Sequence, residues 1–314
     1  MNNCKIFTLA PRESWVCDRF AAEWNLHNSE TSAQSPYECD ILWLLGSWCW
    51  NQIEYSKIRK NTKVCATIHH IVPEKFDDLS KQAWIKRDEI VDFYHVPCKN
   101  TMNQISDLTN KPIYVLPFWV NEKLWFNIDK RSSRSNIGIK DDRSVIVIGS
   151  FQRDTEGSDL KSPKLEKGPD IFFEAINQIK KSSEVHVLLG GWRRQYIINL
   201  LEREGINFSY IELPSFENLN YMYNACDLYI VGSRYEGGPQ SVVECAATNT
   251  PIFSTDVGIA SEILNSECIF DINNVKSILS CQSNTSYNFS RVEPYFIKNG
   301  GFNSFLKMFN KEAK

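Results

Sequence analysis

The chain has 314 residues, of which 42% are hydrophobic and 23% are charged, and its formal net charge is -3. This length predicts two domains, each large enough to bury a core. The weak negative charge argues against a nucleic-acid partner, because such proteins normally carry a basic excess or stripe. The ten cysteines lack the spacing of a zinc site, so we expect buried free thiols in a reducing compartment.

The beginning of the chain and its most apolar stretch bear on location. Residues 1–10 lack the length and layout of a signal peptide. Residues 41–50 are the most apolar stretch, and they are too few to cross a bilayer. We therefore expect a cytoplasmic protein, with any membrane contact peripheral and at the inner face of a membrane. The basic run 57–60 fits such a contact, but it fits a solvated helix face better.

The first half of the chain predicts a strand-rich domain over residues 1–126. Short apolar runs predict strands at 4–9, 40–45, 64–68, 91–95 and 113–116. Every tryptophan except Trp192 lies in residues 1–125, which suits a core and equally an acceptor site where sugars stack on rings. The polar segment 127–143 predicts a linker.

The second half repeats the pattern more clearly, and we assign residues 144–285 to a second domain. Predicted strands lie at 144–149, 185–189, 208–212, 228–232, 251–254 and 268–271. Helical periods lie between them, as in the apolar face of Phe172, Ala175, Ile176 and Ile179. Strict alternation predicts parallel sheets with helices on both faces. The tail 286–314 predicts a final helix that packs back toward the first domain. The fold class is thus α/β with two doubly wound domains facing a central cleft, and ligands are expected at the carboxyl ends of the strands.

One segment, residues 227–244, carries the pattern of a ligand site: D-L-Y-I-V-G-S-R-Y-E-G-G-P-Q-S-V-V-E. A buried strand is expected to end at Gly232, and a tight turn presents Glu236 at its tip. Two glycines then allow a ligand to approach the backbone closely, and Pro239 suits the first position of a helix. The amino end of that helix carries a positive dipole and suits a phosphate.

Two glutamates of this segment are placed to share one ligand. Glu236 and Glu244 are separated by seven residues, one in the turn and one on the helix. A carboxylate in such a place accepts hydrogen bonds from a ribose diol or from sugar hydroxyls. The pattern therefore indicates a nucleotide-sugar site, although two solvated surface carboxylates are the simpler alternative.

The motif S-R-Y-E-G-G-P-x-x-x-x-E resembles the donor-site motif of retaining glycosyltransferase family 4. The flanking N-A-C-D-L-Y-I and P-I-F-S-T-D-V-G-I-A-S-E-I are similar to that family, as is V-I-V-I-G followed by K-G-P-D at 167–170. The match covers residues 144–265, whereas the first half matches only at 67–70 and 116–121. The resemblance implies a GT-B fold, a nucleotide-sugar donor as substrate, transfer with retention and neither metal nor cofactor. The lack of any Asp-x-Asp triplet agrees with the metal-independent chemistry.

The resemblance also implies roles for particular residues. Glu244 matches the carboxylate that holds the donor ribose, and Glu236 matches the one beside the donor sugar. Lys167 matches the lysine that neutralises the pyrophosphate. Either His69 or His70 matches the first-domain histidine near the transferred sugar, and we take His69, with Glu236 and Lys167, as catalytic. The wider donor site is expected to include Gly149, Arg153, Gly190, Gly191, Pro214, Gly237, Gly238 and Pro239.

The sequence departs from the family in three places. The arginine that usually follows the glycine of the first strand is replaced by Ser150, with Arg153 as the nearest substitute. The glycine-rich loop of the first domain is replaced by A-P-R-E-S-W at 10–15. The first domain is also short for the family, so the acceptor site is the part least described by the resemblance.

The leading hypothesis is transfer of a hexosyl group to a glycan, a lipid-linked acceptor or another hydroxyl acceptor, in polysaccharide biosynthesis. A nucleotide-sugar epimerase of the same fold is one alternative, and it would need no acceptor. A degenerate, non-catalytic sugar-nucleotide-binding module is another. A dinucleotide oxidoreductase is disfavoured, because no G-x-G-x-x-G follows a predicted strand.

Overall fold

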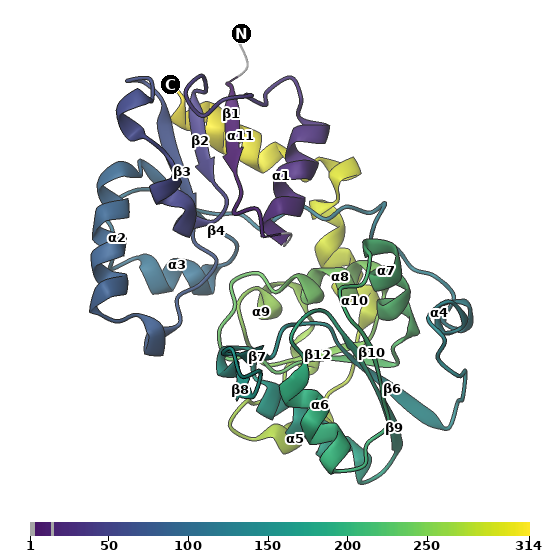
Figure 1. The fold of residues 1–314 in the computed structure, drawn as a ribbon. Helices are drawn as coiled ribbons and strands as arrows, with labels where there is room; N and C mark the ends of the chain where they lie inside the picture. Colours follow the sequence, from purple (N-terminus) through teal and green to yellow (C-terminus); the bar gives the residue numbers. More distant parts are fainter. Residues whose placement is uncertain (1–3, 14–15) are drawn as a thin grey trace. The chain divides into compact units, whose positions relative to one another are not determined.

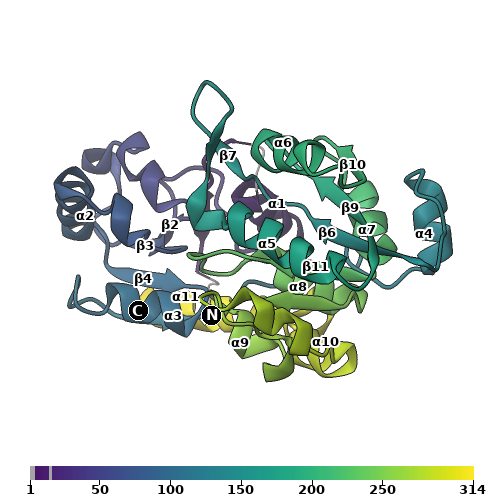
Figure 2. The ribbon, with the colours of Figure 1, turned by 90° about the horizontal axis from the view of Figure 1, so that it is seen from below.

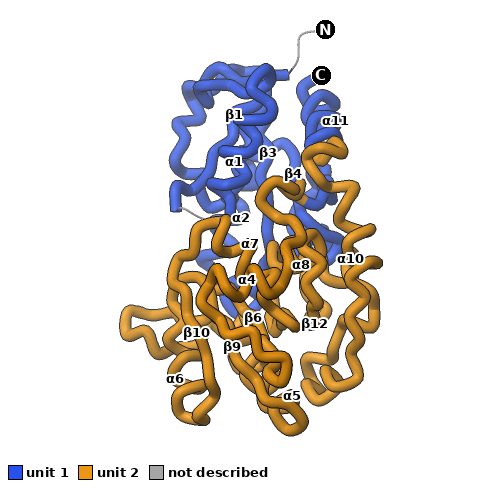
Figure 3. Tube along the Cα trace, turned by 90° about the vertical axis from the view of Figure 1, so that its right-hand side faces the viewer, with its two compact units in different colours: residues 1–117, 302–314 blue, residues 118–301 orange. Residues whose placement is uncertain are grey.

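The computed structural model describes residues 4–13 and 16–314. Two compact units divide the chain (Figure 3): unit 1 holds residues 1–117 and 302–314, and unit 2 holds residues 118–301. Of the expected loop at 10–15, the last two residues lie outside the described part.

The polar segment 127–143, expected to be a linker, belongs to unit 2. It contains the helix α4 (Lys130–Asn136), which packs against α7 (Phe216–Ala225). Arg134 is only 2% exposed, and it bonds the carbonyl of Ala225 at 3.1 Å and the carboxylate of Asp227 at 2.6 Å. The expected boundary was wrong because these polar side chains have partners about ninety residues further along the chain.

Unit 1 is built on a five-stranded parallel sheet in the order β1-β2-β3-β4-β5. The strands are β1 (Ile6–Leu9), β2 (Ile41–Leu44), β3 (Lys63–Thr67), β4 (Phe93–Val96) and β5 (Ile113–Val115). The predicted strands of the first half are confirmed, with small shifts at their ends. A single bridge between Ile6 and Ser32 adds a short pairing on the other side of β1.

Helices cover both faces of this sheet. They are α1 (Val16–His27), α2 (Asp78–Ile90), α3 (Lys99–Ile105) and α11 (Asn303–Glu312). The Trp43 ring of β2 lies 5.4 Å from Trp24 of α1 and 5.0 Å from Phe309 of α11, which Figure 1 shows in yellow beside β1 and β2. Trp84 of α2 and Ile105 of α3 belong to the core of the opposite face. The C-terminal helix therefore completes unit 1.

Unit 2 is built on a second five-stranded parallel sheet, in the order β10-β9-β6-β11-β12. The strands are β6 (Val145–Ser150), β9 (Glu184–Gly190), β10 (Phe208–Ile211), β11 (Leu228–Val231) and β12 (Ile252–Ser254). The chain starts at the central β6, runs outward to β10 and then returns to β11 on the other side. The order thus reverses between β6 and β11, and ligands of such sheets bind at the carboxyl ends of the strands beside this reversal.

The sixth strand expected in this half, at 268–271, is absent from the described chain. Asn265 caps a 3-10 turn, Ser266–Cys268, which carries the chain away from extended geometry. Only a bridge between Ser254 and Ile269 remains, with one hydrogen bond of 2.9 Å from Phe270 N–H to Ser254. The apolar run was misread because its residues are buried without pairing along a full strand.

Helices again cover both faces. They are α5 (Pro169–Lys180), α6 (Gln195–Arg203), α7, α8 (Gln240–Thr248), α9 (Ala260–Ile263) and α10 (Thr285–Val292). The expected apolar face of α5 is confirmed, since its four residues are all buried beside β6 and β9. Figure 1 shows α5 and α6 along this face, and α7 packs on the other through Met222 and Ala225. A small hairpin, β7 (Thr155–Glu156) with β8 (Ser162–Pro163), projects from unit 2 (Figure 2).

All ten cysteines are free thiols, and nine of them are buried, as the sequence predicted. Burial raises the pKa of the Cys65 thiol well above its usual value, so this group is inert. Within residues 4–13 and 16–314, no helix is long and apolar enough to cross a membrane.

Candidate functional site

The loops that follow β6 and β11 bring two predicted site residues together. Lys167 ends the short 3-10 helix Leu165–Lys167, just before α5, and Glu236 lies in the loop between β11 and α8. The Lys167 ammonium contacts a carboxylate oxygen of Glu236. Their side chains are 19% and 11% exposed, so the pair is shielded from water but still reachable from it.

Two glycines explain why these loops approach so closely. Gly168 has φ of 59°, and a Cβ there would lie 1.8 Å from the carbonyl oxygen of Gly232. Any side chain at Gly168 would therefore push the loops apart. The backbone N–H groups of Arg234 and Tyr235 then donate to the carbonyl of Glu166, at 2.9 and 3.1 Å. The Lys167–Glu236 contact rests on this backbone crossing.

The side chain of Arg234 also holds these two loops together. Its guanidinium donates to both carboxylate oxygens of Asp170, at 2.8 and 2.6 Å, and to the carbonyl of Leu165 at 3.0 Å. Burial acts to raise the pKa of Asp170, but hydrogen bonds and the charge of Arg234 outweigh it, and the pKa is lowered. Arg234 is thereby committed to a carboxylate of its own, which makes it a positioning residue for the loop.

Glu244 sits deeper than Glu236. It lies in α8 and is only 4% exposed, and it accepts a hydrogen bond of 2.7 Å from the hydroxyl of Tyr223. Burial, followed by the charge of Glu244, raises the pKa of Tyr223 well above its usual value. The tyrosine therefore stays protonated, and its O–H donates a hydrogen bond to the carboxylate. Pro239 caps α8 rather than opening it, so the helix starts one residue later than predicted.

The predicted glycines at the strand ends have a packing reason of their own. A Cβ on Gly149 would lie 2.5 Å from Cys226 Sγ, and one on Gly190 would lie 2.6 Å from Met222 Cε. Gly191 has φ of 91°, which a side chain rarely tolerates. Packing or backbone conformation favours glycine at Gly149 and Gly191, whereas the atoms close to Gly190 belong to the Met222 and Phe151 side chains. A contact of these glycines with a donor stays a prediction.

The remaining donor-site residues lie in loops at the same edge or beyond β10. Gly237 is buried, and a Cβ on Gly258 would lie 2.1 Å from its carbonyl oxygen. Gly238 is half-buried and accepts a hydrogen bond of 3.1 Å from the side chain of Gln240. Pro214 is half-buried in the loop between β10 and α7. No contact in unit 2 joins Pro214 to the Lys167–Glu236 pair.

Arg153 is held by its own loop. Its Nε donates to the carbonyl of Thr155 at 3.0 Å, and its guanidinium lies 5.3 Å from the ring of Trp192. Arg193 stands 4.9 Å from the same ring. Trp192 is 40% exposed, so two guanidinium groups and one aromatic ring form a cationic patch where the loops after β6 and β9 meet.

Sequence reasoning missed Arg194, which holds two strand ends of the site together. It is 1% exposed, and its Nε bonds Asp154 at 2.5 Å. Its Nη1 donates to the carbonyls of Ser150 and Gly190, the latter at 2.7 Å. Arg194 thus clamps the carboxyl ends of β6 and β9. No sequence signal separated it from its half-buried neighbour Arg193.

His69, the predicted first-domain residue, lies after β3 in unit 1. Its Nε2 is 2.9 Å from the carbonyl oxygen of Leu45, which only accepts, so Nε2 carries the proton. Cys17 Sγ lies 3.4 Å from the same nitrogen, and burial raises the pKa of this thiol to about 12, so no thiolate–imidazolium pair forms. The ring of Trp48, 49% exposed, lies 6.1 Å away. His69 and His70 are both half-buried.

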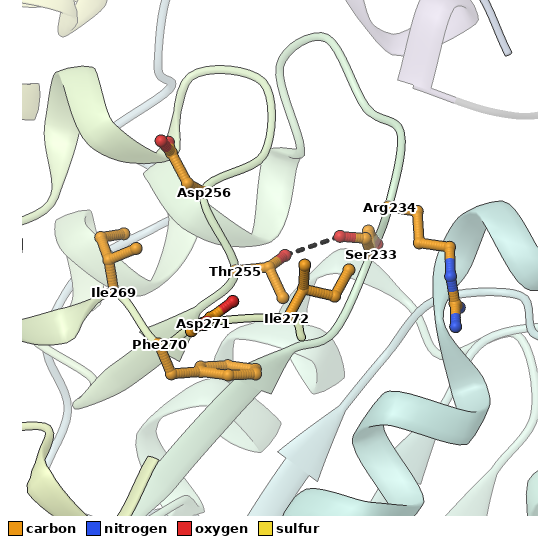
Figure 4. A pocket seen from close by; sticks show the side chains of 8 residues that line it. All are labelled: Ser233, Arg234, Thr255, Asp256, Ile269, Phe270, Asp271 and Ile272. Atoms are coloured by element: carbon orange, nitrogen blue, oxygen red, sulfur yellow. Dashed lines mark hydrogen bonds between the residues drawn. The ribbon is translucent and has the colours of Figure 1, made fainter. Parts of the chain in front are cut away.

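A hollow lies at the carboxyl ends of β11 and β12 (Figure 4). The Thr255 hydroxyl donates to the carbonyl of Ser233 at 2.6 Å across its floor. Its lining consists of Ser233, Arg234, Thr255, Asp256, Ile269, Phe270, Asp271 and Ile272. None of the predicted site residues, all of which are described, lines it. Across the described chain, no group of three or more His, Cys, Asp or Glu side chains is placed to hold a metal ion.

Comparison with known families identifies the second unit. Residues 161–279 match the model of the family described as glycosyl transferases group 1. The matched segment lies within unit 2, and it contains Lys167, Glu236 and Glu244. No curated protein matches the sequence.

Solved structures extend the likeness to the whole chain. HepE from Anabaena, solved with UDP and glucose, has a TM-score of 0.73 at 12% identity, over 97% of this chain and 100% of HepE. A glycosyltransferase from Rickettsia africae has a TM-score of 0.68 at 14% identity, over 100% of both chains. Sucrose-phosphate synthase from Thermosynechococcus elongatus has a TM-score of 0.66 at 16% identity, over 96% of this chain and 79% of that enzyme. The TM-scores over nearly the whole chain establish the fold, and the expected α/β class with two Rossmann-like domains of the GT-B type is confirmed.

Proposed function

We propose that this protein is a glycosyltransferase that moves a hexosyl group from a nucleotide-sugar donor to a hydroxyl acceptor, with retention and without a metal ion. The observation that carries the proposal is the meeting of Lys167 and Glu236 beside the reversal of the second sheet. The group 1 family match over 161–279 supports it, and neither the epimerase nor the non-catalytic module is favoured by any comparison.

The charges of the site suit the departure of a nucleoside diphosphate. The bond from the anomeric carbon to the phosphate oxygen breaks, so negative charge develops on the diphosphate. The Lys167 ammonium and the positive amino end of α8 are the groups that would stabilise this charge. The acceptor oxygen forms the new bond, and its proton passes to the leaving phosphate on the same face.

The two carboxylates suit the neutral parts of the donor. Glu244, buried and oriented by Tyr223, would accept from the ribose hydroxyls. Glu236, nearer to solvent, would accept from hydroxyls of the transferred sugar. Arg153 would add positive charge near the diphosphate in place of the arginine that Ser150 replaces. The role of His69 in unit 1, contact with the sugar, belongs to the same proposal.

A binding screen tests the proposal first. Thermal unfolding is followed with UDP, GDP, ADP and CMP, and then with the sugar donors of the nucleotide that stabilises the fold. We expect one nucleoside diphosphate to raise the melting temperature. Absence of any shift, confirmed by calorimetry, would contradict the assignment of a donor site.

Two further measurements test the chemistry. Proton NMR of early product should show the anomeric configuration of the donor, and the inverted anomer would contradict retention. EDTA should leave most of the activity intact, because Lys167 and the end of α8 supply positive charge where other enzymes use a cation. Full loss that manganese restores would contradict a metal-independent mechanism.

A further inference from the structure

In the ligand-free protein, the ammonium group of Lys167, which is proposed to bind phosphate, already forms an ion pair with a carboxylate. Lys167 contacts Glu236, and both side chains are largely withdrawn from water. A diphosphate that reaches Lys167 therefore meets a group of its own charge. Water and salt screen this repulsion less than they would at an open surface.

Other cations of these loops have acidic partners of their own. Arg234 binds Asp170 at 2.6 Å, and Lys164 lies 3.4 Å from Glu166. Arg234 and Lys164 would be available to a Glu236 carboxylate displaced from Lys167 only if one of these pairs broke. A ligand that brings neutral hydrogen-bond donors can instead satisfy the displaced Glu236 carboxylate.

We propose that Glu236 is a specificity-determining residue that favours the intact nucleotide-sugar over the free nucleoside diphosphate. A donor supplies a phosphate for Lys167 and hydroxyl groups for the released carboxylate. A free nucleoside diphosphate supplies only the phosphate, and it leaves the displaced carboxylate close to its own negative charge. The inference rests on the proposed function, because it takes the donor to bind at Lys167.

The same exchange helps the product to leave. Once the sugar has been transferred, Glu236 loses the hydroxyl groups that it accepted from. It then competes with the diphosphate for Lys167, and the contact seen in the ligand-free protein forms again. Glu236 thus assists donor binding and product release through one movement of its side chain.

Calorimetry on Glu236→Gln tests the inference. UDP, GDP and ADP are each titrated into wild-type protein and into the variant, and the sugar donor of the accepted nucleotide follows. We expect the free diphosphate to bind the variant about fivefold more tightly, in the range of a partly shielded ion pair. The sugar donor should gain nothing or bind more weakly. Glu236→Ala, which also removes the carboxylate, should tighten the free diphosphate in the same way.

A matched control and a coupled variant separate this effect from general electrostatics. Asp256→Asn removes one negative charge from an exposed side chain in the loop after β12, and it should leave both affinities unchanged. In a Lys167→Gln background, Glu236→Gln should bring a smaller gain, because the competition for the ammonium is lost and only the repulsion between carboxylate and phosphate is relieved.

The outcomes distinguish the inference from the proposed function. If wild-type protein binds none of the nucleotides or their sugar donors, the proposed function fails and the inference fails with it. If the wild type binds a diphosphate and Glu236→Gln binds it no more tightly, the inference alone is overturned. Equal tightening by Asp256→Asn and Glu236→Gln would also overturn it, since any lost charge would then suffice.

Discussion

Two ion pairs follow the strand ends of unit 2, and their surroundings differ. Arg194 and Asp154 are 1% and 2% exposed, and Arg194 also donates to backbone carbonyls. Lys167 and Glu236 are 19% and 11% exposed and join two loops. A fully buried, fully bonded pair is costly to open, whereas a half-buried pair can exchange one partner for a ligand. Burial therefore separates the pair that holds the fold from the pair proposed to bind the donor.

The largest effect is expected where the buried pair is broken. Asp154→Ala leaves the Arg194 guanidinium buried without its carboxylate, and this should lower the free energy of unfolding by about 3–5 kcal/mol. Urea unfolding followed by circular dichroism measures the loss. Asp159→Ala, an exposed position on the same hairpin, should change stability little. Equal stability of the two variants would mean that Arg194 finds another partner, and the contrast between the pairs would fail.

Breaking the half-buried pair should instead damage catalysis. Lys167→Ala removes a contact that strengthens as the diphosphate gains charge, so kcat should fall on the order of a hundredfold, or about 3 kcal/mol. Unfolding should change little, because the side chain is partly solvated. Steady-state kinetics with the correct donor measures the effect, with Lys161→Ala as an exposed lysine control. Wild-type kcat would contradict the role, and a pure KM effect would assign Lys167 to ground-state binding.

The Tyr223–Glu244 hydrogen bond shares features of both ion pairs. Glu244 is buried, like Asp154, and it belongs to the proposed donor site, like Glu236. Tyr223→Phe removes the 2.7 Å hydrogen bond to Glu244, and stability should fall by about 2 kcal/mol. Nucleotide affinity should fall as well, since the carboxylate proposed to hold ribose loses its orientation. Calorimetry and urea unfolding measure both losses, and Tyr221→Phe on the same helix is the control. A loss of stability with unchanged nucleotide affinity would place Glu244 outside the donor site.

The comparison also shows how far the sequence could reach. The period of apolar residues predicted the strands of both sheets, and a local motif predicted Glu236 and Glu244. Lys167 was predicted because a resemblance, rather than periodicity, singled it out. Its contact with Glu236 depends on two glycines in different loops, Gly168 and Gly232, and no local pattern encodes that crossing.

The features that could not be predicted from the sequence depend on contacts between distant segments. Arg193 and Arg194 are adjacent and chemically identical, yet only Arg194 turns inward, because the ends of β6 and β9 offer it carbonyls and Asp154. The segment expected as a linker is ordered by the pairing of Arg134 with Asp227. In both cases a charged residue is buried by partners that composition and period do not reveal.

Two histidines of unit 1 show the same contrast between a partly buried and a completely buried group. His69 is half-buried, whereas His95 is completely buried at the end of a chain of hydrogen bonds. Trp43 Nε1 donates to Thr67 Oγ1 at 2.8 Å, and the Thr67 hydroxyl lies 2.9 Å from His95 Nδ1. His95 Nε2 lies 2.8 Å from the carbonyl oxygen of Leu116. Because the carbonyl only accepts, Nε2 carries the proton and Nδ1 accepts from Thr67, so the chain of bonds fits a neutral ring.

The change expected per pH unit is the smallest of these effects, and it concerns the pH dependence of folding. Burial, with a smaller contribution from the charge of His69, lowers the pKa of His95 to about 3, while a histidine in the unfolded chain titrates near about 6.5. Between these two pKa values, His95 is protonated in the unfolded state and neutral in the folded state. Stability that is present above about pH 6.5 should be lost as the pH falls toward 3, by up to about 1.4 kcal/mol per unit from this residue. Urea unfolding at a series of pH values measures the slope, which should be shallower in His95→Gln and unchanged in His27→Gln, a control at an exposed histidine. Equal slopes in wild type and His95→Gln would show that His95 takes up its proton in the folded protein, and that burial does not hold it neutral.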